Sequence, residues 1–111
     1  KYPKNIKYFK LEEDPGIYGT WNYALSKATG EYITNANLDD RKAPHSLERH
    51  AKELYMNPDV SLVYADSFIT KEQNELFENN SSDGNRYKFE QFSKEAMLRG
   101  NQPHNNPMRL N

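Results

Sequence analysis

The sequence predicts an α/β fold, with mainly parallel strands flanked by helices, in a single domain that spans residues 1–111. Apolar residues recur with a helical period between residues 17 and 28. Short apolar runs that are typical of buried strands follow at residues 31–35 and 60–65, and a second helical pattern at 44–57 separates them. Strands that alternate with helices in this order are typical of a sheet with parallel strands.

The first predicted unit is a strand, a helix and a strand. Residues 6–11 alternate in polarity well enough to indicate a strand. Asp14 before Pro15 suits the start of a helix, and Gly30 suits its end. A right-handed crossover through this helix implies parallel pairing of the two strands. The apolar face of the helix consists of Ile17, Trp21, Ala24, Leu25 and Ala28. We therefore expect Trp21 to lie in the core.

The second half of the chain begins with the helix at 44–57. Its apolar face consists of Leu47, Ala51, Leu54 and Tyr55. The run at 60–65 is almost continuously apolar, which predicts a strand buried on both faces. Residues 67–87 start apolar and then become rich in Asn, Ser, Asp and Gly, and residues 79–85 are expected to form an exposed loop at the tip of a hairpin. A third helix is predicted at 89–99, and an extended tail at 101–111.

The composition indicates a folded protein with a thin core. Leu, Ile, Val and Phe supply 20 of the 111 residues, and eight Tyr and one Trp add to the apolar surface available for burial. The net charge of −1 is too small for a disordered chain of this kind. We therefore expect either further sequence or another subunit, including a second copy of the chain, to complete the core.

Composition also excludes several classes of protein. The absence of cysteine excludes disulfides and thiolate metal sites. No apolar run is long enough for a membrane span, and no signal peptide is visible. Lysine and arginine are scattered rather than clustered, which argues against a nucleic-acid partner. We expect a cytoplasmic protein, either free or held peripherally at the inner face of the membrane.

A pair of adjacent carboxylates is the main candidate for chemistry. Asp39 and Asp40 follow the predicted strand at 31–35 and precede a helix start at Pro44. Ligands of open α/β sheets bind at the carboxyl ends of the strands. Two aspartates at that edge are suited to hold a divalent cation that bridges nucleotide phosphates. The alternative is a solvated turn whose side chains cap the following helix.

Several separated elements around this pair occur in a characteristic order. They are the stretch 14–25 with Gly16, Gly19 and Asn22, then Ala28-Thr29-Gly30-Glu31-Tyr32-Ile33, Asn37-Leu38-Asp39-Asp40, Pro44 and Leu47-Glu48. This order resembles the family-2 glycosyltransferases, which have the Rossmann-like, nucleotide-sugar-binding GT-A fold. The resemblance covers about residues 6–70 and is weaker over 71–111. One departure is Asn37, which stands at the first position of the family's Asp-x-Asp motif and offers an amide oxygen but no charge.

The resemblance implies transfer of a sugar from a nucleotide-diphospho-sugar to a glycan acceptor such as a cell-surface polysaccharide, with inversion. It implies a Mn²⁺ or Mg²⁺ cofactor held by Asp39 and Asp40. It also implies donor contacts from Gly16, Asn22, Asn37 and Asp39. The competing interpretations are a solvated helix-surface role for Asn22 and a purely conformational role for Gly16.

The family's first two strands and its acceptor-side segment have no counterpart here. The chain is therefore expected to be the central part of a catalytic domain, inactive by itself and without an assignable catalytic base. Asp66 does not match the position of that base. The three histidines, His45, His50 and His104, are interpreted as surface or capping residues.

The main alternative is a non-catalytic α/β fragment or interaction module that self-associates through exposed strand edges. An EF-hand is excluded because Asp40 occupies its glycine position and Ser46 its glutamate position. A phosphotransferase is disfavoured because the sequence has no phosphate-binding G-x-x-x-x-G-K-[ST] motif.

Overall fold

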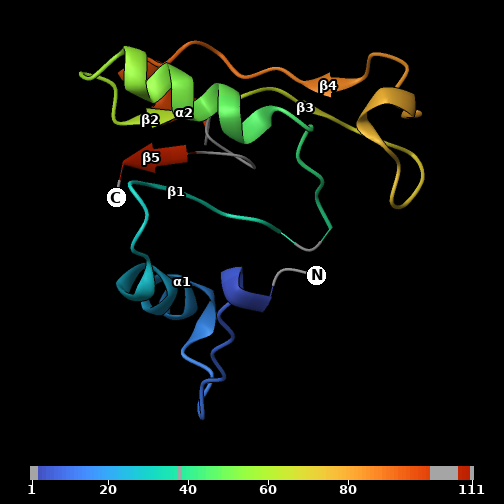
Figure 1. Cartoon of the computed structure of the whole chain (residues 1–111). Coiled ribbons are helices and arrows are strands. Elements are labelled where there is room, and N and C mark those ends of the chain that lie inside the picture. The colour runs from blue at the N-terminus through green and yellow to red at the C-terminus, as the bar shows by residue number, and fades with distance from the viewer. Residues whose placement is uncertain (1–2, 38, 101–107, 111) are drawn as a thin grey trace.

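Helices and two small antiparallel sheets make up the architecture (Figure 1). The computed structural model describes residues 3–37, 39–100 and 108–110. The elements in chain order are η1 (Pro3–Asn5), α1 (Gly16–Lys27), β1 (Tyr32–Thr34), α2 (Ser46–Met56), β2 (Leu62–Val63), β3 (Ser67–Phe68), η2 (Phe77–Asn79), β4 (Arg86–Tyr87), α3 (Lys94–Arg99) and β5 (Met108–Leu110).

The larger sheet has the order β1-β5-β2, and both of its ladders are antiparallel. The predicted sheet of mainly parallel strands is therefore wrong. The reason is that β5 comes from the end of the described chain and inserts between two strands that run in the same direction. Thr34 of β1 and Val63 of β2 both lie opposite Met108 of β5. The carboxyl ends of β1 and β2 therefore reach the same edge of the sheet, although the two strands do not pair with each other.

The predicted strand at 6–11 does not form, so the predicted parallel crossover through α1 is also wrong. Most of this segment is exposed, and Ile6 and Tyr8 are among its exposed apolar side chains. Phe9 instead meets the ring of Tyr23 edge to face, with 5.8 Å between the ring centroids. Among the described residues, no strand lies beside this segment for it to pair with.

Helix α1 begins at a glycine for a conformational reason. Gly16 has a φ of +73°, which favours glycine over any residue with a side chain. Its N–H donates to the Oδ1 of Asp14 at 2.8 Å. Asp14, two residues before the first residue of the helix, therefore helps to start it. Gly19 faces Pro15, whose Cβ lies 2.6 Å from where a Cβ on Gly19 would stand. Both glycines are thereby explained by local geometry.

The apolar face of α1 is not buried. Trp21 is 46% exposed, and no residue of the helix is buried among the described residues, so the prediction of a core tryptophan is wrong. Figure 1 shows α1 beyond β1, on the side of the molecule opposite α2. The apolar residues do lie along one face of the helix, but such a face is buried only where another part of the protein packs against it. Trp21 instead contacts Tyr18 edge to face, at 6.3 Å between centroids.

The core lies where α2 packs against β2 and β5 (Figure 1). The buried apolar side chains of the described residues are Leu54, Ala96 and Met108. On α2 the buried residues are His50 and Leu54, whereas the predicted face included Leu47 and Tyr55, which are exposed. The prediction that His50 lies at the surface is therefore wrong. The face of α2 that carries His50 and Leu54 is the one that packs against the sheet. His45 precedes α2 at the surface, as predicted.

Truncation of Leu54 is expected to be costly. Leu54 is 2% exposed, so Leu54→Ala should lower the free energy of unfolding by about 2 to 5 kcal/mol through lost burial and a residual cavity. Leu47→Ala is the matched control on the same helix, since Leu47 is 48% exposed and should change stability by under about 1 kcal/mol. Urea unfolding followed by circular dichroism measures both. Equal losses for the two variants would contradict this placement of the core.

The remaining elements are shorter than predicted. The strand expected at 60–65 is reduced to β2, and its Leu62 is exposed, so burial on both faces is wrong. The expected hairpin is confirmed, because β3 and β4 pair antiparallel. Its polar loop is not fully exposed as predicted, since Ser82 is buried. Helix α3 begins at Lys94, later than predicted, because the side chain of Ser93 caps it by accepting from the N–H of Ala96 at 3.0 Å.

The extended tail predicted at 101–111 contains the central strand β5, which the sequence did not indicate. The rest of that tail, with His104, lies outside the described residues.

Candidate functional site

The loop after β1 carries the predicted site residues. Asn37, Asp39 and Asp40 are all exposed. The Nδ2 of Asn37 donates to the Oδ2 of Asp40 at 2.7 Å, and the Nδ2 of Asn35 lies 3.5 Å from the Oδ1 of Asn37. The amide at the first position of the motif therefore orients one of the two carboxylates. The structure brings Asn37 and Asp40 together, and it keeps Asp39 and Asp40 accessible to solvent.

The donor set of this loop fits a hard divalent cation. Two carboxylates and an amide oxygen are the kind of ligand that Mg²⁺ and Mn²⁺ accept. The described residues contain no group of three or more His, Cys, Asp or Glu side chains arranged to hold a metal. Phosphate oxygens would therefore have to supply several ligands, as is usual where Mg²⁺ binds through one or two carboxylates.

Lys42 connects this loop to the sheet and to α2. Its Nζ lies 3.4 Å from the Oγ1 of Thr34, the last residue of β1. Burial lowers the pKa of Lys42, and the negative charge of Asp40 partly opposes that shift. Burial also lowers the pKa of His50, and the positive charge of Lys42 lowers it further. Asp40, Lys42 and His50 thus form an electrostatically linked series that runs from the loop into the core.

Asp66 lies at the same edge of the sheet as the loop after β1, but its carboxylate has structural partners. Its Oδ1 accepts from the N–H of Phe89 at 3.0 Å, and its Oδ2 lies 3.8 Å from the Nε of Arg86. These contacts join the segment after β2 to β4 and to the segment that follows it. These partners explain Asp66 as a structural link.

The two predicted donor contacts on α1 belong to a different part of the fold. Gly16 begins the helix and Asn22 lies exposed on it, whereas Asn37 and Asp40 belong to the loop after β1. The N–H of Gly16 already donates to Asp14. Donor contacts from Gly16 and Asn22 stay predictions.

Comparison with known proteins identifies the family. Residues 1–109 match the family model described as glycosyl transferase family 2. The chain belongs to this family. A protein of Methanocaldococcus jannaschii, named as an uncharacterized glycosyltransferase, is 28% identical over 91 residues. Those residues cover 82% of this chain and 31% of that protein, so the chain spans about a third of its relative's length. No solved structure matches the chain.

Membership of this family confirms the resemblance to the family-2 glycosyltransferases. It implies the α/β GT-A fold and an enzyme class that transfers sugars. In this family-2 segment, the strand before the aspartate pair and the helix after it both form as the family order predicts. No helix in the described part of the chain combines the length and the hydrophobicity that crossing a membrane requires.

His50 is the residue of this family-2 segment that sequence reasoning missed. It is 6% exposed, and its Nδ1 has no hydrogen-bond partner among the described residues. A signal was present in the sequence, because His50 lies four residues before Leu54 and shares a helix face with it. A histidine on an apolar line of a helix is a candidate for burial.

Burial of a neutral histidine makes stability depend on pH. The pKa of His50 is lowered in the folded state, whereas the unfolded chain titrates near the ordinary value of about 6.5. Above that pH neither state is protonated at this residue. As the pH falls below about 6.5 the unfolded state binds the proton first, so the free energy of unfolding should decrease. Lys42 is the charged group that adds to this lowering of the pKa of His50.

Urea unfolding at pH 7.5 and 5.5 tests this prediction. The loss of stability at the lower pH should shrink in His50→Gln and persist in His45→Gln, which removes an exposed histidine just before the helix. An unchanged pH dependence in His50→Gln would contradict it.

Proposed function

We propose that the protein to which this chain belongs transfers a sugar from a nucleotide-diphospho-sugar to a glycan acceptor with inversion of the anomeric centre. Membership of glycosyl transferase family 2 supports the transfer of a sugar. The single structural observation that supports a donor site here is the exposed Asp39–Asp40 pair at the carboxyl end of β1, with Asp40 oriented by Asn37.

The proposed reaction is a single displacement. An acceptor hydroxyl oxygen forms a bond to the anomeric carbon while the bond from that carbon to the diphosphate oxygen breaks. The nucleoside diphosphate leaves with the bonding electrons, and the hydroxyl proton passes to a base that is not assigned among the described residues. Attack from the face opposite the leaving group inverts the configuration.

The proposed cofactor is Mn²⁺ or Mg²⁺, which when bound to a diphosphate neutralises the charge that develops on the leaving group. Asp39 and Asp40 would hold it, and their oxygens suit such an ion. Asn37 would keep Asp40 oriented through the 2.7 Å hydrogen bond. Gly16 and Asn22 are the proposed further contacts to the donor. A cell-surface polysaccharide as acceptor and a cytoplasmic or peripheral membrane location remain part of this proposal.

Calorimetry tests the donor site directly. Mn²⁺ should bind this chain weakly by itself and more tightly with UDP or GDP, with a change in the fluorescence of the half-exposed Trp21 if α1 takes part. Nucleotide binding that is independent of Mn²⁺, or no binding by a chain shown to be folded by circular dichroism, would contradict the proposal.

A non-catalytic interaction role is the second candidate, and the exposure of large apolar side chains favours it. Ile17, Tyr18 and Trp21 are all exposed on α1. Exposed apolar side chains that lie together on one helix are common at sites of association. Sedimentation measurements over a range of concentrations, without metal or nucleotide, distinguish the two. Association without any Mn²⁺-dependent binding of nucleotide would favour the interaction role.

A further inference from the structure

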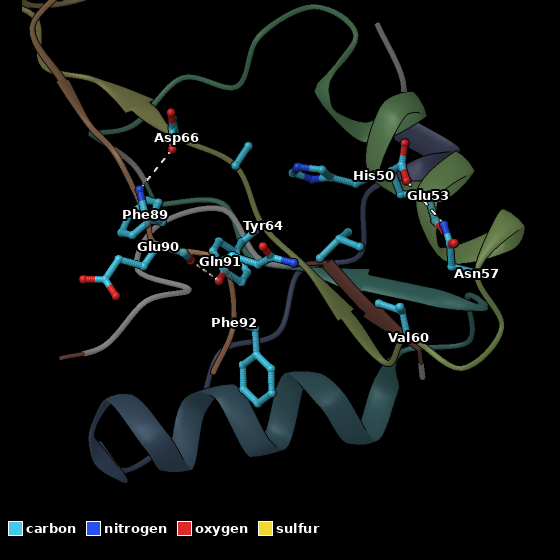
Figure 2. Close-up of a pocket in the computed structure, with 12 residues that line it drawn as sticks. His50, Glu53, Asn57, Val60, Tyr64, Asp66, Phe89, Glu90, Gln91 and Phe92 are labelled. Carbon is cyan, nitrogen blue, oxygen red and sulfur yellow. Dashed lines mark hydrogen bonds between the residues drawn. The ribbon is translucent and has the colours of Figure 1, made fainter. Parts of the chain in front are cut away.

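A groove of about 660 Å³ lies between α2, β2 and the segment Phe89–Phe92. His50 and Glu53 line it from α2, and Asn57 lines it from the end of that helix (Figure 2). This volume is within the range of small-molecule sites, which typically combine an apolar wall with a few polar groups. The groove includes none of the residues predicted to bind the sugar donor.

A buried polar group without a partner lies against this groove. Figure 2 shows the imidazole of His50 extending from α2 toward the middle of the groove. The side chain is 6% exposed, and its Nδ1 has no hydrogen-bond partner in the described structure. A buried acceptor or donor that lacks a partner is unfavourable. The ring borders the groove, so a ligand hydroxyl held against it would lie beside this polar group.

The wall of the groove is apolar and held in place. Tyr64 and Phe89 meet edge to face at 5.9 Å between ring centroids. The hydroxyl of Tyr64 donates to the backbone oxygen of Glu90 at 2.8 Å, which joins β2 to the opposite side of the groove. Val63 adds aliphatic surface beside them. An apolar wall of this kind suits the C–H face of a sugar ring, whose hydroxyls then point to the polar rim.

The charges around the groove favour a neutral ligand. Two of its three carboxylates have an arginine partner outside the groove, since Asp66 lies 3.8 Å from Arg86 and Glu90 lies 2.5 Å from Arg99. No lysine or arginine of the described residues lines the groove itself, so it offers no cation to a phosphate. Carboxylate and amide oxygens that accept hydrogen bonds are well suited to hydroxyl groups.

The position of the groove relates it to the predicted donor loop. Asp66 follows β2, whose carboxyl end meets the same edge of the sheet as that of β1. The end of the groove at Asp66 therefore follows the same edge of the sheet as the loop that carries Asp39 and Asp40.

We propose that the groove between α2 and Phe89–Phe92 binds a neutral sugar residue of the acceptor glycan, with the sugar ring against Tyr64 and Phe89 and its hydroxyls facing His50, Glu53 and Gln91. This inference deepens the proposed transferase function and rests on it. It assigns the acceptor to the class of neutral rather than anionic glycans.

Amide and histidine NMR shifts of the whole chain test the proposal without metal or nucleotide. The probes are the neutral disaccharides cellobiose and maltose, with glucuronic acid as an anionic sugar. At least one neutral disaccharide should produce saturable shifts at Val63, Tyr64, Phe89 and the ring of His50. Glucuronic acid should bind more weakly. Saturable shifts confined to α1, or stronger binding of the anionic sugar, would overturn the proposal.

A matched pair of variants separates a groove contact from a general effect on the surface. Gln91→Ala removes an exposed amide that lines the groove, and Gln73→Ala removes an exposed amide from the loop between β3 and β4. Gln91→Ala should weaken binding of the disaccharide by about three- to tenfold, the usual effect of losing one hydrogen bond. Gln73→Ala should leave the affinity unchanged. Equal affinity for both variants and the parent chain would overturn the placement of the ligand.

The calorimetric titration with Mn²⁺ and nucleotide keeps the two proposals distinguishable. Intact metal-dependent nucleotide binding without any response to sugar would overturn the groove proposal and leave the proposed function standing. Sugar binding in the groove without any binding of metal and nucleotide would overturn the assignment of the groove to an acceptor.

Discussion

Replacing Asp39 and Asp40 together with alanine is expected to lower the Mn²⁺-dependent affinity for UDP or GDP by more than about a hundredfold. Changes that affect only the partners of metal ligands typically cost about 10- to 100-fold, so loss of both proposed ligands should cost at least as much. The substitution should not unfold the chain, because both side chains are exposed. Calorimetry with the parent chain and the double variant measures the difference.

Asp59→Ala is the control for the double aspartate variant. Asp59 is also exposed, and it lies in the turn between α2 and β2, away from the loop after β1. The substitution removes a surface carboxylate outside the proposed site. It should leave the Mn²⁺-dependent affinity for nucleotide within about twofold of the parent chain's, as expected for an independent site. A double variant that binds nucleotide and metal as well as Asp59→Ala does would remove the aspartate pair from the mechanism.

Replacing Met108 with asparagine is expected to produce the largest loss of stability. Met108 is 5% exposed at the centre of the β1-β5-β2 sheet, opposite Thr34 and Val63. The change removes buried apolar surface and buries an amide without a partner. Together these effects should lower the free energy of unfolding by about 3 to 5 kcal/mol. A domain with a thin core has little stability to lose, so the variant should be largely unfolded.

Arg109→Asn provides the matched control within the same strand. Arg109 is the next residue of β5, and its side chain is exposed. This variant therefore places an asparagine in the same strand but on the face exposed to solvent. It should lower the free energy of unfolding by no more than about 1 kcal/mol. Urea unfolding and circular dichroism compare the two. Similar stability for both variants would mean that β5 is not the buried centre of this sheet.

Local sequence signals predicted several elements well. Helix α1, helix α2 and strand β1 form within a few residues of their predicted bounds. Gly16 adopts a φ of +73° at the start of α1, a position for which glycine is suited. These signals depend on the period of apolar residues and on turn chemistry, both of which act over a few neighbouring residues.

The candidate site was predictable to a similar extent. The order of motifs around Asp39 and Asp40 led to the correct family, and it placed the pair after a strand that does form. The hydrogen bond between Asn37 and Asp40, and the link from Asp40 through Lys42 to His50, could not be predicted. They depend on how the loop folds back against Thr34 at the end of β1.

The sequence by itself determined the family, the α/β class, the two longer helices and the carboxylate pair, because each is encoded in short stretches of chain. Only the tertiary structure decided that β5 inserts antiparallel between β1 and β2, that Trp21 stays exposed, and that His50 is buried. Strand pairing and the rotation of a helix about its axis depend on contacts between residues far apart in the chain. A three-residue strand such as β5 carries no period of its own, so its partners alone establish its place.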